Sequence, residues 1–284
     1  MKILVIGDAH FKNKMGLTYI LDYLNWEYKF GGIQDIVHYD YIYSPGKAIN
    51  MSNYPDKKFI FGPHFSVFPD QKLSILNNKC KNAIYIQPSK WVVELWRNMK
   101  AEVVLPIKSF PFPVNTNKFK PIEGINKTEV FLYYKRRNPE ELNFITNYLK
   151  DKNINFKKFD YMQRYNEEDY LNTLQNSKYG IVLDAHESQG FAIEEALSCN
   201  VPLLVWNTTT MAQEYGFNYE NIPCTTIPYW DNKCGEFFYN QEEFIATFDL
   251  FLNKLNTYNP RQYILDTLST EVCANRWKEL FNNL

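Results

Sequence analysis

Residues 181–206 constrain the fold of this chain more than any other stretch. Residues 181–183 and 203–206 are short apolar runs typical of buried strands. Between them, apolar side chains at 191, 193, 196 and 197 have the spacing of a short helix, which Asn200 and Pro202 would end. A strand, a loop, a helix and a second strand in this order predict one unit of a parallel sheet. We therefore expect an α/β protein.

The same alternation of apolar runs and helical spacing extends through the rest of the chain. Strands are predicted at 2–7, 40–43, 58–61, 83–86, 103–105, 130–134, 156–159 and 225–227. Helices are predicted at 17–30, 73–79, 92–99, 140–151, 167–175, 211–215, 242–255 and 272–281. The proline-rich segment 106–121 is predicted to be a linker, because proline has no amide hydrogen to donate within a sheet.

Length and composition exclude several classes of protein. The chain has 284 residues, enough for two compact domains, and its net charge of −1 argues against a protein that binds nucleic acid through bulk electrostatics. It contains no apolar run long enough for a transmembrane helix and no signal-peptide pattern. Five scattered cysteines without a C-x-x-C pair indicate neither a zinc site nor a disulfide framework. A cytoplasmic location is expected, and peripheral contact with a membrane stays open.

The loop between the strand at 181–183 and the following helix is the candidate ligand site. A helix N-terminus offers unpaired N–H groups and a partial positive charge, which suit a phosphate. Gln189 and Gly190 lie at this junction, and glycine allows a ligand to approach the backbone closely. Glu187 precedes the junction and Glu195 follows it on the helix. A phosphate site flanked by two carboxylates fits a nucleotide sugar, with one carboxylate on the sugar hydroxyls and the other on the ribose.

Residues 187–196, ESQGFAIEEA, followed by Val201-Pro202, resemble the E-x7-E signature of the retaining GT-B glycosyltransferases of family 4. The resemblance implies that Glu187 contacts the donor sugar and that Glu195 holds the ribose. It also implies that the backbone around Gln189, Gly190 and Phe191 binds the phosphates.

The family fold consists of two Rossmann-like domains whose parallel sheets face each other across a cleft. The resemblance therefore implies an acceptor domain at 1–112, a nucleotide-sugar donor domain at 113–265, and a C-terminal helix at 266–284 that returns to the first domain. The resemblance covers the second half of the chain well and the first half only in outline.

The resemblance extends to the basic run that follows the predicted strand at 130–134. Members of the family place basic residues there on the donor pyrophosphate, and Arg136 is the better match, with Lys135 as its neighbour. Glu141 occupies the position of a lysine of the family pattern, which is a departure. A charged surface run without ligand contacts is the alternative. Tyr161 lies in the loop where the family places the nucleobase, and stacking on a base or plain packing both stay open.

Three polar residues of the first half follow predicted strands, where ligands of open α/β sheets bind. Asp8 and His10 follow the strand at 2–7, and His64 follows the strand at 58–61. We expect Asp8 and His10 to line the cleft on the acceptor side. His64 is a candidate catalytic group together with Glu187, because imidazole titrates near neutral pH. A histidine that is satisfied within its own loop is the alternative.

These residues together predict a hexosyltransferase-type glycosyltransferase. It would move a sugar from a nucleoside diphosphate donor to a glycan or another hydroxyl acceptor, with retention of configuration. No Asp-x-Asp occurs in the sequence, so no metal or other cofactor is expected. Two alternatives remain. A GT-B nucleotide-sugar 2-epimerase would need acids and histidines from the first domain, and a non-catalytic carbohydrate-binding protein would need no intact donor site.

Overall fold

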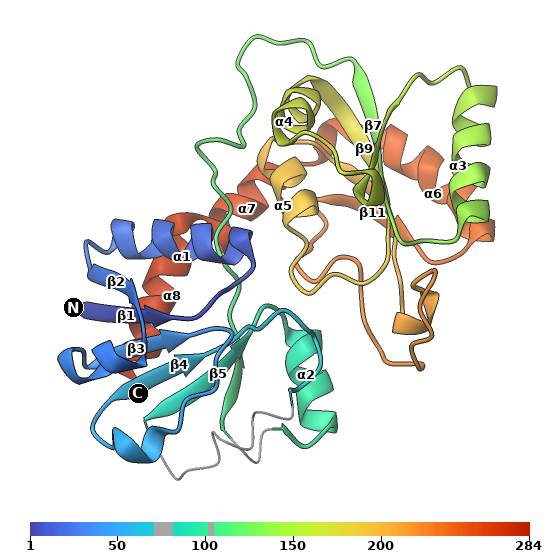
Figure 1. Ribbon diagram of the computed structural model, residues 1–284. Coiled ribbons are helices and arrows are strands. Elements are labelled where there is room, and N and C mark those ends of the chain that lie inside the picture. Colours follow the sequence, from blue (N-terminus) through green and yellow to red (C-terminus); the bar gives the residue numbers. More distant parts are fainter. Residues whose placement is uncertain (71–81, 102–104) are drawn as a thin grey trace. The chain divides into compact units, whose positions relative to one another are not determined.

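The computed structural model describes residues 1–70, 82–101 and 105–284 (Figure 1). The chain divides into two compact units, and each contains one parallel sheet. The first unit comprises Met1–Pro113 and Leu268–Leu284, and the second comprises Val114–Thr267. The predicted α/β class is confirmed. The helix predicted at 73–79 and residues 103–104 of a predicted strand lie outside the described residues.

The first unit is built on a six-stranded sheet in the order β2-β1-β3-β4-β5-β6. Its strands are β1 (Lys2–Ile6), β2 (Glu27–Gly31), β3 (Tyr41–Ser44), β4 (Lys58–Phe61), β5 (Ala83–Gln87) and β6 (Ile107–Ser109). All adjacent strands run parallel. Its α-helices within the described residues are α1 (Phe11–Tyr23), α2 (Lys90–Asn98) and α8 (Thr270–Asn282). Because neighbouring strands are parallel, β1, β3 and β4 end at the same edge of the sheet. This edge positions the polar residues that follow the strands.

Two predictions for the first unit are wrong. The helix predicted at 17–30 begins earlier, at Phe11, and ends at Tyr23, because 27–31 instead forms strand β2 at the sheet edge beside β1. Asn25 takes a left-handed conformation between the two elements. The segment predicted as a linker contains β6, which pairs with β5 ahead of Pro111 and Pro113. In both places backbone pairing with a distant strand outweighed the local pattern.

The C-terminal helix α8 belongs to the first unit, where it packs against α1 (Figure 1). The Trp277 side chain is fully buried, and its ring makes edge contacts with Tyr43 and Phe110. Phe281 continues this apolar face with contacts to Tyr41 and Trp26. The helix thus completes the core of a unit whose sheet begins more than two hundred residues earlier. None of the described helices is long and apolar enough to cross a membrane.

The second unit is built on a five-stranded sheet in the order β11-β10-β9-β7-β8, again with all neighbours parallel. Its strands are β7 (Glu129–Lys135), β8 (Lys157–Asp160), β9 (Ser177–Asp184), β10 (Leu203–Trp206) and β11 (Gly235–Phe238). Its helices are α3 (Pro139–Asp151), α4 (Glu167–Asn176), α5 (Phe191–Ser198), α6 (Gln241–Asn253) and α7 (Pro260–Leu268). The predicted strand–loop–helix–strand unit is confirmed as β9, α5 and β10.

The strand predicted at 225–227 is wrong, and β11 is the last strand of the sheet. The backbone N–H of Thr226 donates to the Asn207 side chain at 2.9 Å, and its hydroxyl donates to the carbonyl of Ala185 at 2.9 Å. The segment therefore braces the loop after β9 and does not pair in the sheet.

Gly235 begins β11 with φ 138°, and a Cβ there would lie 1.9 Å from the Leu203 carbonyl oxygen. Only glycine allows this pairing. The helix predicted at 211–215 is a short 3-10 helix, Met211–Gln213.

Candidate functional site

The candidate site lies where β7, β9 and β10 end at the same edge of the second sheet. After β9, a short loop leads into α5, and Gly190 caps this helix in a left-handed conformation with φ 93°. A Cβ at Gly190 would meet only ordinary contacts, so the backbone conformation is what favours glycine here. The backbone N–H of Glu187 donates to the carbonyl of Thr225 at 3.0 Å, which holds the loop. The first N–H groups of α5 lack carbonyl partners within the helix, an arrangement that suits an anion.

Three ionisable side chains meet at the ends of β7 and β9. Lys135 and Asp184 are direct partners in the parallel register, and the Lys135 Nζ atom lies 3.9 Å from an Asp184 carboxylate oxygen. The same ammonium makes a short hydrogen bond with the Glu187 carboxylate. The Lys135 and Glu187 side chains are only 15% and 16% exposed, and that of Asp184 is 1% exposed. This ion pair is thus desolvated and stronger than a surface pair.

Burial and mutual charge set the protonation of these groups. Burial alone would raise the pKa of Glu187, but Lys135 holds it below its ordinary value. Burial would lower the pKa of Lys135, and the two neighbouring carboxyl groups raise it above its ordinary value instead. Burial raises the pKa of Asp184 far above its ordinary value despite the opposing charge of Lys135. Burial and the Lys135 charge therefore shift the pKa values of the two neighbouring carboxyl groups in opposite directions.

Arg136 is held by residues from the segment after β10. Its guanidinium donates to Glu214 at 2.9 Å and lies 5.0 Å from the centre of the Phe217 ring. Glu214 is 3% exposed, and its second carboxylate oxygen lies 3.0 Å from the Nδ1 atom of His186. The opposing charges keep the pKa of Glu214 low although burial alone would raise it. The Arg136 side chain keeps 35% of its surface exposed, so it can still meet an anion.

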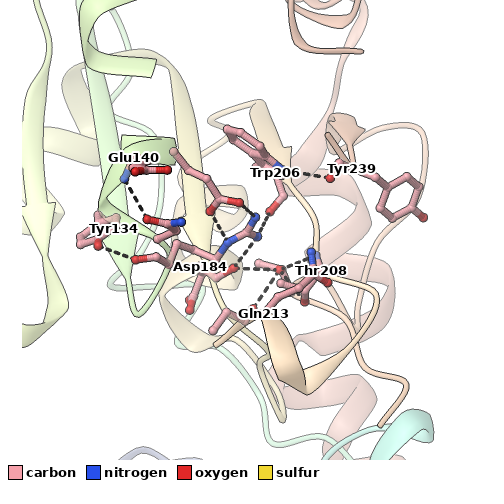
Figure 2. A network of polar contacts seen from close by, with 12 residues as sticks. Tyr134, Glu140, Asp184, Trp206, Thr208, Gln213 and Tyr239 are labelled. Atoms are coloured by element: carbon pink, nitrogen blue, oxygen red, sulfur yellow. Dashed lines mark hydrogen bonds and ion pairs between the residues drawn. The ribbon is translucent and has the colours of Figure 1, made fainter. Parts of the chain in front are cut away.

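Arg137 has a structural position. Its guanidinium is fully buried and makes two hydrogen bonds of 2.7 Å to Glu141. It also donates to the carbonyl of Trp206 at 3.0 Å and lies 5.4 Å from the centre of the Trp206 ring. The surrounding network, which joins Asp184, Trp206 and Thr208 at the ends of β9 and β10, appears in Figure 2. The basic run is therefore not a solvated surface, and Glu141 forms an ion pair within the unit.

The remaining predicted donor residues lie around α5. The Gln189 side chain is 3% exposed and donates to Glu194 at 3.0 Å, so only its backbone is placed to meet a ligand. Glu195 is 6% exposed, and its charge contributes to the raised pKa values of Tyr165 and Tyr170, after the larger effect of burial. Glu195 thus faces the tyrosines beside α4. Phe191 is half-buried at the first position of α5.

Tyr161 lies on the β8 side of the same edge. It follows β8 directly, its side chain is exposed, and the Lys135 ammonium lies 4.7 Å from the centre of its ring. The structure therefore brings together Lys135, Glu187 and Tyr161, which are separated in sequence by up to fifty-two residues. A cation over the ring face leaves the ring edge and hydroxyl available to a ligand.

The candidates of the first unit lie at the carboxyl ends of β1 and β4. Asp8 and His10 are exposed, and the His10 backbone begins α1. The two ring nitrogens of His64 lie 2.7 Å from the Tyr85 hydroxyl and 2.8 Å from the Phe68 carbonyl oxygen. The carbonyl oxygen can only accept, so the Nε2–H donates to Phe68, and in the neutral ring Nδ1 accepts from the Tyr85 hydroxyl. Burial lowers the pKa of His64. Its predicted catalytic role stays a prediction.

Sequence reasoning missed the acids and the histidine that support the site. Asp184 was predicted to lie in the loop after the strand at 181–183, but it is the last residue of β9, and nothing in its local pattern distinguished it from a turn residue. Glu194 was given no role, because the motif placed the ribose contact on its neighbour Glu195. Glu214 holds Arg136 from a position seventy-eight residues away along the chain, and His186 in turn contacts Glu214. Spacing in one sequence carries no signal for such pairs.

Known structures share this architecture. Sucrose-phosphate synthase from Thermosynechococcus elongatus superimposes with a TM-score of 0.62 at 11% identity, covering 100% of this chain and 98% of that one. The catalytic domain of starch synthase IV from Arabidopsis thaliana, bound to ADP and acarbose, gives 0.52 at 9% identity over 86% and 72% of the two chains. The chain has the GT-B fold.

TarM gives a TM-score of 0.51 at 16% identity, covering 85% of this chain and 54% of that one. The GT-B chain thus spans about half the length of TarM. These neighbours are GT-B glycosyltransferases. No protein-family profile matches the sequence, and no curated protein is significantly similar to it.

Proposed function

We propose that this GT-B protein is a retaining glycosyltransferase that takes a hexose from a nucleoside diphosphate sugar and transfers it to a glycan or another hydroxyl acceptor. The observation that carries the proposal is the cluster of Lys135, Glu187 and the Gly190-capped helix α5 at one sheet edge. It combines a cation, a carboxylate and a helix N-terminus, which are the groups that a sugar diphosphate requires. The glycosyltransferase neighbours support the same reaction class.

Each donor group receives one role in this proposal. The N-terminus of α5 and the cations Lys135 and Arg136 bind the diphosphate. Glu187 accepts hydrogen bonds from the donor sugar, and Glu195 binds the ribose. Tyr161 contacts the nucleobase. Glu187 can turn to the sugar because the incoming phosphate competes for its partner, the Lys135 ammonium.

Rate enhancement would come mainly from positioning and from stabilising the departing diphosphate. The cations and the helix dipole face the position where negative charge develops as the glycosidic bond to phosphate breaks. We propose that no bound metal is needed for this step. Asp8, His10 and His64 of the first unit are the proposed groups on the acceptor side, and the cytoplasm is the proposed location.

A product assay separates this function from its alternatives. The protein would be incubated with ADP-, GDP- and UDP-sugars, with and without simple sugar acceptors, and the products separated by chromatography. A transferase releases nucleoside diphosphate faster when acceptor is present. An epimerase interconverts donors without that release, and a binding protein changes neither. Release without any acceptor dependence, or interconversion alone, would refute the proposal.

Variants localise the activity. Glu187→Gln removes the carboxylate charge but keeps its shape, so we expect turnover to fall by about 100-fold or more. Glu242→Gln, an exposed change on α6, is the matched control and should behave as wild type. Equal activity of the Glu187→Gln variant and the control would remove Glu187 from the site.

A further inference from the structure

Asp184 is the most unusual group of the second unit. It is the last residue of β9, its side chain is fully buried, and among the described residues neither carboxylate oxygen has a hydrogen-bond partner. The Lys135 Nζ atom, at 3.9 Å, is beyond hydrogen-bonding distance. An ionised carboxylate without donors is costly to bury, whereas a protonated one is not.

The charges around Asp184 give a second reason to expect a proton. Each cation of the basic run already has a carboxylate partner: Lys135 has Glu187, Arg136 has Glu214, and Arg137 has Glu141. An ionised Asp184 would add an uncompensated negative charge at the sheet edge where the proposed function places a diphosphate. Such a charge in a desolvated site would oppose an anionic ligand strongly.

We propose that Asp184 is a neutral carboxylic acid in the working protein, and that it donates its proton in a hydrogen bond to the Glu187 carboxylate once a donor phosphate draws Lys135 away, as a positioning residue of the donor site. Two carboxyl groups can bond only when one is protonated, because two carboxylates are both acceptors. The effect on donor binding rests on the proposed function, but the protonation of Asp184 does not.

The groups that face Asp184 agree with this assignment. Tyr133 and Lys135 face it from β7, Tyr170 faces it from α4, and Glu187 lies beside it on its own loop. Burial raises the pKa of both tyrosines, so their phenols are neutral and bring no charge. Burial also raises the pKa of Asp184 itself.

The proton on Asp184 explains how Glu187 can release Lys135 when a donor binds. When a phosphate draws the Lys135 ammonium away, Glu187 accepts a hydrogen bond from Asp184 with one oxygen and turns its other oxygen to the sugar. Once Asp184 is ionised, the two carboxylates repel each other and both attract Lys135, so the phosphate loses its cation. Donor affinity should therefore fall as pH rises through the pKa of Asp184, by up to about tenfold per pH unit.

Infrared spectroscopy tests the proton directly. A difference spectrum of wild type minus Asp184→Asn at neutral pH should contain a protonated-carboxyl band, and the band should shift in deuterium oxide. Asp249→Asn, on the exposed face of α6, is the matched control and should produce no such band. A wild-type difference spectrum that contains only carboxylate bands for Asp184 would overturn the proposal, whatever the protein binds.

Titration with ADP, GDP and UDP between about pH 6 and about pH 10 tests the consequence. We expect wild-type affinity to fall at alkaline pH. Asp184→Asn keeps a hydrogen-bond donor to Glu187 and should bind with pH-independent affinity over the same range, whereas Asp184→Ala should bind more weakly throughout. Parallel alkaline losses in wild type and Asp184→Asn would overturn the positioning role. If none of the diphosphates binds any variant, the proposed function fails, and the infrared band alone decides the state of Asp184.

Discussion

Replacing Arg137 with methionine should destabilise the second unit strongly without removing a ligand contact. The guanidinium makes two hydrogen bonds of 2.7 Å to Glu141 and one of 3.0 Å to the carbonyl of Trp206, all on a fully buried side chain. Methionine keeps most of the aliphatic stem and loses every donor. Removing one partner of a buried ion pair costs about 3–5 kcal/mol. The Glu141 side chain is 24% exposed and regains some water, so we expect the lower end, about 3 kcal/mol.

Urea unfolding followed by circular dichroism measures this free energy of unfolding. Lys157→Met is the matched control, because it breaks an ion pair with Asp169 whose side chains are 44% and 51% exposed. That pair should contribute less than about 1 kcal/mol. The double variant Arg137→Met/Glu141→Leu should recover part of the loss, since no unpaired carboxylate remains. A loss below about 1 kcal/mol for Arg137→Met would refute the view that Arg137 ties the strand ends together.

Three further outcomes follow from the proposed site. Glu195→Ala should weaken nucleoside diphosphate binding by about 1.5–3 kcal/mol in isothermal titration while the fold survives, and unchanged affinity would exclude Glu195 from the ribose site. His64→Ala should lower turnover about 100-fold or more at unchanged nucleotide affinity; a loss that matches the fraction of unfolded protein would make His64 structural. Activity should persist in EDTA, and a loss that Mg²⁺ or Mn²⁺ restores would contradict metal independence.

The lowered pKa of His64 also predicts a pH effect on stability. Burial disfavours the imidazolium in the folded state, so as pH drops below the ordinary pKa of 6.5 the unfolded chain binds more protons than the folded one. The free energy of unfolding should therefore fall as pH drops below that value. His64→Asn should reduce this dependence in thermal unfolding measured across the range, and an unchanged slope would show that His64 does not cause it.

The sequence predicted the elements whose signals are local. The strand before Asp184, the helix after Gly190 and the strand from Leu203 all follow from apolar spacing and from a glycine at the junction. The left-handed φ of Gly190 gives that glycine its physical reason. The predicted phosphate site was also local, since a helix N-terminus and the residues beside it are continuous in sequence.

Features that depend on long-range pairing could not be predicted. Residues 27–30 were predicted to continue the helix but form β2 together with Gly31, because their backbone groups pair with β1 at the sheet edge. Gly235 looks like a turn residue, but it begins the last strand, where the Leu203 carbonyl leaves no room for a side chain. The partner of Arg136 is Glu214, seventy-eight residues away. Such contacts arise from packing, which spacing in one sequence does not encode.

Amide hydrogen exchange with bound nucleoside diphosphate tests the central claim most directly. The protein would be screened with ADP, GDP and UDP, and a ligand at a hundred times its dissociation constant should stabilise the fold by about 2.7 kcal/mol. Exchange with that ligand should slow at residues 135–136, at 187–195 and at Tyr161, all at one edge of the second sheet. If no diphosphate binds, or if protection is confined to the first unit, the proposed donor site is wrong.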